Sequence, residues 1–168
     1  MDLKSQLKFY KHYHRNATNI LIHSIFVPII LYTSLAILSD IKIYQLNVNI
    51  WVSLIYSCFY IYLCVPTGIF FVILFFFMNN LISKGFLSGN KEKFGLFILG
   101  WICQFIGHFK YEGNKPAIFD NLFQSLILAP YFILFELLFK LGFYKELLKQ
   151  LEGDTKLRGI GKQKERNK

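Results

Sequence analysis

The sequence predicts an all-α, polytopic helical membrane protein with about four to five apolar helices. Of its 168 residues, 54% are hydrophobic and 18% are aromatic, and the mean hydropathy is +0.40. The apolar residues gather in long runs typical of membrane-spanning segments, although several runs are short, which leaves a soluble all-α fold as the alternative. The net charge of +9 lies mainly at the two ends, which places both termini in the cytoplasm. No nucleic-acid recognition motif accompanies the basic residues, so we expect no nucleic-acid partner.

The length is that of one domain. We expect residues 1–143 to form a single helical membrane domain with an N-terminal amphipathic helix, and residues 144–168 to form a basic cytoplasmic tail. The start of the chain is predicted to form a helix on the membrane surface. Four residues there recur at helical spacing and would share one face: Leu3, Leu7, Tyr10 and His14. A break follows at 15–18, where Asn16 or Thr18 can cap a new helix.

The remaining apolar segments follow in order. The first span is 19–38, and a polar loop covers 39–49. Segments 50–65 and 69–82 flank Pro66-Thr67-Gly68 and form either a tight hairpin or one kinked helix. After a basic loop, the later segments are an apolar span, a polar turn and a last apolar segment: 94–109, 110–121 and 122–143.

The number of membrane crossings does not follow from this count. Two cytoplasmic termini require an even number of crossings, whereas there are five apolar segments. One segment must therefore be re-entrant or interfacial, or two must form one helix. We favour a re-entrant last segment hinged at Pro130, because proline can break a helix and Glu136 opposes full immersion.

Polar groups of possible chemical use cluster at one junction. Gln104, His108 and Glu112 are spaced four apart, so on a helix they share a face where an apolar run meets a polar turn. The three cysteines lack metal-site spacing and are interpreted as small buried hydrophobic residues: Cys58, Cys64 and Cys103.

A second group of polar residues lies near the N-terminus. Asn19 and His23 share a helical face, but His14 and His23 are nine apart, half a turn out of phase. They converge only if the chain bends between them, whereas His12 would share a face with His23 on an unbroken helix. The choice between His12 and His14 stays open at this point. Imidazole with carboxylate is a ligand set for non-haem Fe(II), and zinc accepts the same ligands.

Two motif blocks carry a resemblance to a known family. They are Tyr10-x3-His14-Arg-Asn-x2-Asn19-x3-His23-x4-Pro28 and Trp101-x2-Gln104-Phe-x-Gly107-His108-x3-Glu112-Gly-x-x-Pro116-Ala117, followed by Asp120-Asn121-x2-Gln124-Ser-Leu-x2-Ala129-Pro130 and Glu136. Together they resemble the membrane 2-hydroxy-fatty-acid dioxygenase family of fatty-acid α-oxidation in phytosphingosine breakdown. The sequence departs from the family pattern at Ala17, where proline is expected, and at Phe26, where glycine is frequent.

The resemblance implies an enzyme that cleaves a long-chain 2-hydroxy fatty acid with O2 and Fe(2+) to CO2 and the fatty acid one carbon shorter. It implies a multi-pass protein of the endoplasmic reticulum membrane, with the site and the termini facing the cytoplasm. The implied metal ligands are His14, His23 and His108. The residues expected to assist are Glu112 (a fourth ligand or an acceptor for an imidazole), Gln104 and Asn19, while Arg15, Lys110 and Lys115 are expected to attract the carboxylate headgroup. The alternative is a non-catalytic lipid-binding or structural membrane protein.

Overall fold

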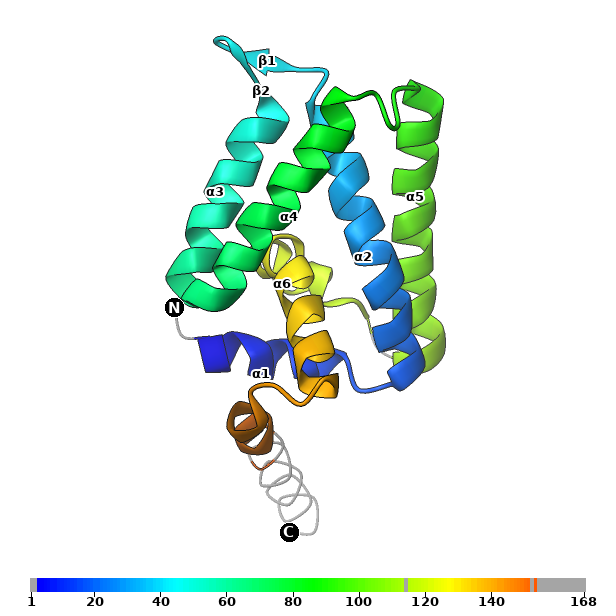
Figure 1. The fold of residues 1–168 in the computed structure, drawn as a ribbon. Coiled ribbons are helices and arrows are strands. Elements are labelled where there is room, and N and C mark those ends of the chain that lie inside the picture. Colours follow the sequence, from blue (N-terminus) through cyan, green and yellow to red (C-terminus); the bar gives the residue numbers. More distant parts are fainter. Residues whose placement is uncertain (1–2, 114, 152, 154–168) are drawn as a thin grey trace.

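The structure, a computed structural model, describes residues 3–113, 115–151 and 153. It is mostly helical (Figure 1), as predicted. The α-helices are α1 (Leu3–Tyr13), α2 (Ala17–Leu38), α3 (Val48–Leu63), α4 (Val65–Ser83), α5 (Asn90–Ile106) and α6 (Leu122–Lys140). A π-helix η1 (Gly107–Glu112) extends α5, and a short 3-10 helix η2 (Ala117–Phe119) precedes α6. A small antiparallel hairpin, β1 (Lys42–Ile43) with β2 (Leu46–Asn47), occupies the predicted loop between α2 and α3.

The N-terminal helix buries the face that its spacing predicts. Leu7, Tyr10 and His14 are buried, and the Tyr10 ring lies 4.8 Å from Phe132 of α6. Figure 1 shows α1 lying across one end of the bundle. The predicted break is confirmed: α2 begins after Asn16, whose side chain accepts a hydrogen bond from the Thr18 amide at 2.9 Å.

Helices α2 and α5 pack closely along their length and run in opposite directions (Figure 1). At Gly100 of α5 a Cβ atom would lie 2.6 Å from Cγ1 of Ile30, so only glycine permits this approach. At the far end of the pair, Lys93 of α5 binds Asp40 with Nζ–O distances of 2.9 and 2.8 Å. This ion pair holds the start of α5 against the end of α2.

The segment around Pro66 forms a hairpin of two helices. Cys64 takes an extended conformation (φ −163°, ψ 115°) between α3 and α4, and Pro66 lies in the first turn of α4, where its missing N–H costs little. Of the two alternatives from the sequence, the structure therefore has the hairpin.

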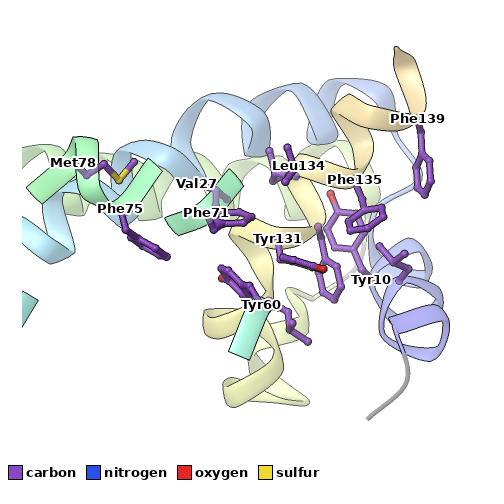
Figure 2. Close-up of a cluster of buried hydrophobic side chains, with 14 of the residues drawn as sticks. Tyr10, Val27, Tyr60, Phe71, Phe75, Met78, Tyr131, Leu134, Phe135 and Phe139 are labelled. Atoms are coloured by element: carbon purple, nitrogen blue, oxygen red, sulfur yellow. The ribbon is translucent and has the colours of Figure 1, made fainter. Parts of the chain in front are cut away.

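Aromatic side chains from α3, α4 and α6 form the core (Figure 2). Tyr60 and Tyr131 are fully buried with ring centroids 4.8 Å apart. Both hydroxyls are satisfied: Tyr60 donates to the carbonyl of Ile127, and the Tyr131 hydroxyl lies 2.7 Å from Oγ1 of Thr67. Burying the phenol rings therefore leaves no unpaired hydroxyl at this point.

The hinge predicted at Pro130 is wrong. Helix α6 continues through Pro130, and the chain turns later, by 110° between Ser125–Lys140 and the short helix Lys145–Leu151. Packing of the buried neighbours Tyr131 and Phe132 offsets the cost of proline inside the helix. Glu136 is buried because Lys11 of α1 forms an ion pair with it at 2.9 Å.

The predicted count of four to five apolar spans is not confirmed. Within the part of the chain that the structure describes, α2 and α4 are long and apolar enough to cross a membrane. The bent pair of Ser125–Lys140 and Lys145–Leu151 would make a third if it counts as one span. The shorter α3 is also apolar. Exposed apolar side chains on α4, such as Ile73, Phe76 and Phe77, suit contact with lipid.

Candidate metal and substrate site

Three buried histidines from distant parts of the chain meet at one end of the α2–α5 pair. His14 follows α1, His23 lies in α2, and His108 lies in η1. Their ring centroids are 4.5 to 4.9 Å apart, and one nitrogen of each lies within 4.8 Å of those of the other two. The bend before α2 is what brings His14 to His23. The side chain of His12, the rival from the sequence, lies outside the described residues.

Backbone carbonyls fix the tautomers of two of the rings. Nδ1 of His14 donates to the carbonyl of Tyr10 at 3.0 Å, and Nδ1 of His23 donates to the carbonyl of Asn19 at 2.9 Å. Each Nε2 is therefore left with its lone pair, the form that binds a metal. Nε2 of His14 and Nδ1 of His108 are buried without a hydrogen-bond partner among the described residues. Buried imidazole nitrogens without partners, facing one another, are the donor set of a transition-metal site.

The electrostatics favour neutral imidazole. Burial lowers the pKa of His14 well below its ordinary value, and the neighbouring rings of His23 and His108 lower it further. The ring of His14 is therefore neutral at pH 7. A neutral ring can bind a cation, whereas an imidazolium cannot.

The widened turn of η1 places His108 against α2. A Cβ at Gly107 would collide with Oδ1 of Asn19, so the absence of a side chain lets η1 approach α2 at this level. Hydrogen bonds from residue i to i+5 give more than four residues per turn, and Gly113 ends the turn with a φ of 66°. Glu112 stays near His108 in this turn, but hydrogen bonds from the start of α2 hold its carboxylate.

We expect Gly107→Ala to lower the stability by about 1–3 kcal/mol, because the added methyl group must push η1 away from Asn19. Thermal unfolding in detergent would measure the effect, and metal content should fall with it as His108 moves. Gly95→Ala is the matched control, since a Cβ at Gly95 of α5 meets no atom within 4 Å. Equal unfolding temperatures for the two variants would contradict the close approach.

Glu112 has partners other than the imidazoles. Its Oε1 accepts hydrogen bonds from the backbone amides of Arg15 and Asn16 at 2.8 and 2.9 Å, and from Nδ2 of Asn19 at 3.1 Å. It is not among the groups close enough to share a metal with the three histidines in the described residues. Asn19 is fully buried against η1, where it contacts both Gly107 and Glu112. The two residues hold the bend and the π-helix together.

The basic residues expected to attract a carboxylate lie on the surface. Arg15, Lys110 and Lys115 are exposed, and none of them lines the cavity beside the histidines. Lys115 forms an ion pair with Asp120, and Nζ of Lys110 lies 5.6 Å from the centre of the Tyr111 ring. The structure thus does not bring these three side chains to the histidine cluster.

A largely apolar cavity of about 340 Å³ opens beside the histidines. All three histidines line it together with Gln104, which is buried and whose Nε2 has no hydrogen-bond partner within the described chain. Tyr10 also lines it, with its ring stacked 4.1 Å from His14 and its buried hydroxyl likewise unpaired there. From the sequence, Tyr10 is expected on the apolar face of the first helix and in a family motif, but not in the site. Its position four residues before His14, matching Asn19 before His23, is the signal that it belongs to the site.

Comparison with known proteins identifies the family. The family described as "2-hydroxy-palmitic acid dioxygenase Mpo1-like" matches residues 1–141. The chain belongs to this family. It is 48% identical to the 2-hydroxy-palmitic acid dioxygenase MPO1 of Saccharomyces cerevisiae over 160 residues, which cover 94% of this chain and 92% of the yeast protein. No solved structure matches the chain. The family resemblance drawn from the motif blocks is confirmed.

Proposed function

We propose that this protein is an Fe(II)-dependent dioxygenase that converts a 2-hydroxy fatty acid and O2 to the fatty acid one carbon shorter, CO2 and water. The reaction balances without another reductant, because the C1–C2 bond and the C2–H bond are both broken and each supplies two of the four electrons that reduce O2. The observation that carries the proposal is the set of three converging buried imidazoles at the polar end of an apolar cavity. The name of the yeast relative supports the substrate class and the reaction.

The residues present fit a metal, and the chemistry favours iron. His14, His23 and His108 would hold it through neutral nitrogens, which suit iron, copper and zinc alike. Zinc has no redox chemistry, so a dioxygenase built on this site requires another metal. Iron(II) bound there would activate O2 and polarise the oxygen atoms of the substrate. Three protein ligands leave coordination positions open for both reactants.

Two neutral donors are placed to orient the headgroup. The hydroxyl of Tyr10 and the amide of Gln104 are buried beside the histidines, and each has a hydrogen atom without an acceptor in the described structure. The carboxylate and 2-hydroxyl oxygens of the substrate are acceptors that would satisfy them. Hydrogen bonds to a carboxylate are stronger than those between neutral groups, so the pair would bind and orient the ionised acid. Arg15, Lys110 and Lys115 would act earlier, by attracting the anion to the surface near the site.

The membrane supplies the substrate in this proposal. Two apolar helices suggest membrane association, and long-chain 2-hydroxy acids partition into lipid. We place the protein in the endoplasmic reticulum membrane with the histidine cluster and both basic termini on the cytoplasmic side, as the positive-inside rule favours. Site-directed labelling that placed the two termini on opposite sides would contradict this orientation.

Metal analysis and oxygen uptake test the proposed function. Protein purified in detergent should bind about one iron per chain, and 2-hydroxypalmitate should stimulate O2 consumption with release of CO2. Chelation should abolish turnover, and Fe(II) but not Zn(II) should restore it. Tyr10→Phe should raise the KM about tenfold, because it removes one hydrogen bond to the headgroup. Binding of 2-hydroxypalmitate without metal and without oxygen uptake would instead establish a lipid-binding protein, the alternative that the apolar cavity also supports.

A further inference from the structure

We propose that the end of the cavity remote from the histidines determines the length of the acyl chain that the protein accepts, with Val52 and Tyr56 of α3 as the residues that set the limit. The inference rests on the proposed function, because it takes the occupant to be a 2-hydroxy fatty acid. It adds a specificity-determining pair on a helix that contributes none of the histidines.

The cavity follows α2 for most of the length of that helix. Its lining on α2 extends from His23 through Ile30 to Leu38. From His23 to Leu38 there are fifteen steps of 1.5 Å, or about 22 Å, close to the length of an extended long-chain fatty acid. Helix α5 and η1 also line the cavity, from Phe97 to His108. The shape is that of a channel along two antiparallel helices.

The polar groups of the cavity mark its orientation. The histidines, Tyr10 and Gln104 lie together near the start of α2. The lining toward Leu38 is apolar apart from the hydroxyls of Tyr56 and Ser34, and that of Ser34 is bonded to the carbonyl of Ile30 at 2.7 Å. A carboxylate buried at the far end would therefore lose its hydration and meet fewer donors than at the histidines. The headgroup therefore belongs at the histidines, and the methyl end of the tail points toward Leu38.

Val52 and Tyr56 are residues of α3 that line the cavity, about 6 and 12 Å along the helix from its start. Helix α3 starts at the level where α2 stops, since only the short β-hairpin separates them, and no residue of that hairpin lines the cavity. Tyr56 is held in place by aromatic neighbours, with its ring 5.7 Å from Tyr60 and 6.0 Å from Phe75. A side chain supported in this way gives a fixed wall against which chain length can be measured.

The test is a chain-length profile for variants at this wall. Oxygen uptake would be measured with 2-hydroxy acids from 2-hydroxydecanoic to 2-hydroxystearic acid. Val52→Phe should lower kcat/KM for the longest acid by about tenfold or more while leaving the shortest unchanged, because one or two methylenes no longer fit. Tyr56→Leu should shift the optimum toward longer acids. Leu54→Phe is the matched control, since Leu54 is exposed on the same helix and does not line the cavity.

A binding assay separates this inference from the proposed function. The same acids would displace cis-parinaric acid from metal-free protein, which needs no turnover. If the variants shift the chain-length profile of binding while the wild-type protein consumes no oxygen, the proposed function is overturned and the role of Val52 and Tyr56 is supported. If wild type, Val52→Phe and Tyr56→Leu all turn over the acids with the same chain-length profile, the role of the two residues is overturned and the proposed function is supported. Should Val52→Phe fail to fold, Ser34→Leu on α2 fills the same end of the cavity and must give the same shift.

Discussion

Replacing His108 with alanine should remove the bound metal and reduce turnover of 2-hydroxypalmitate by about a thousandfold or more. The three imidazoles are the only groups in the described chain that meet at metal-binding distance, so loss of one leaves an incomplete donor set. Groups that act as a unit lose most of their joint effect when one of them is removed. Iron content by mass spectrometry and oxygen uptake would be measured on the same preparation.

The stability of His108→Ala distinguishes a metal ligand from a structural histidine. Nδ1 of His108 is buried without a partner among the described residues, which costs about 1–3 kcal/mol in the metal-free protein. Its removal offsets much of the packing that is lost, so metal-free wild type and variant should unfold at similar temperatures. His12→Ala is the control and should retain iron. Wild-type turnover and full iron content in His108→Ala would refute the site, and unfolding of the variant alone would indicate a structural role.

The bend before α2 could be predicted from the sequence because the spacing of the histidines required it and the residues at that point could form it. His14 and His23 are nine apart and cannot face each other on one helix, and the polar residues between them include a capping asparagine. Asn16 does cap α2, although alanine stands at position 17 where the family pattern has proline. A strong cap therefore suffices to start the helix without proline at its first position.

The partners of Glu112 could not be predicted, because the backbone amides that bind its carboxylate are those of Arg15 and Asn16, far away in the chain. The π-helix from Gly107 to Glu112 likewise depends on a tertiary contact, since the glycine lies against Asn19 of another helix. Nothing in the local sequence identifies that neighbour. The same limit explains the error at Pro130, where a local rule for helix breaking was overridden by burial of the adjacent aromatic residues.

The cavity likewise could not be predicted from the sequence. Its lining comes from five α-helices, from η1 and from the segment between η1 and α6. Most of the lining side chains are apolar and cannot be distinguished in sequence from those that face lipid. Phe97 lines the cavity and Phe94, one turn earlier, is exposed. Only the packing of the helices decides which of the two phenylalanines faces inward.

Replacing Glu112 with alanine should lower metal affinity about 10–100-fold while leaving the ligand set unchanged. The carboxylate accepts hydrogen bonds from the amides of Arg15 and Asn16, which precede the first turn of α2. In a capping box, the side chain of the third residue of the helix accepts a hydrogen bond from the backbone amide of the N-cap residue. Helix α2 has no acidic residue in its first turn that could do this. Glu112 supplies the missing acceptor from η1, and its negative charge also favours the N-terminus of the helix. Without it, three donors lose an acceptor and His14 loses its fixed position relative to His108.

Glu112→Gln separates this positioning role from direct ligation. The amide oxygen can still accept from both backbone N–H groups, so Glu112→Gln should keep most of the metal affinity that Glu112→Ala loses. With Co(II) in place of iron, the visible absorption spectrum of Glu112→Gln should match that of the wild type, because the ligands are unchanged. Glu146→Ala is the matched control, since that carboxylate is exposed and forms an ion pair with Lys149 three residues away.

The three measurements together assign the role of Glu112. A changed Co(II) spectrum in Glu112→Gln would make the carboxylate a ligand and contradict the geometry described above. Unchanged metal affinity in Glu112→Ala would show that the bend holds without it, through the Asn16 cap alone. Near-normal turnover of Glu112→Ala at saturating Fe(II), with a lowered unfolding temperature, is the expected result. It follows from a carboxylate that holds His14 and His108 on one side of the cavity and does not itself touch the metal.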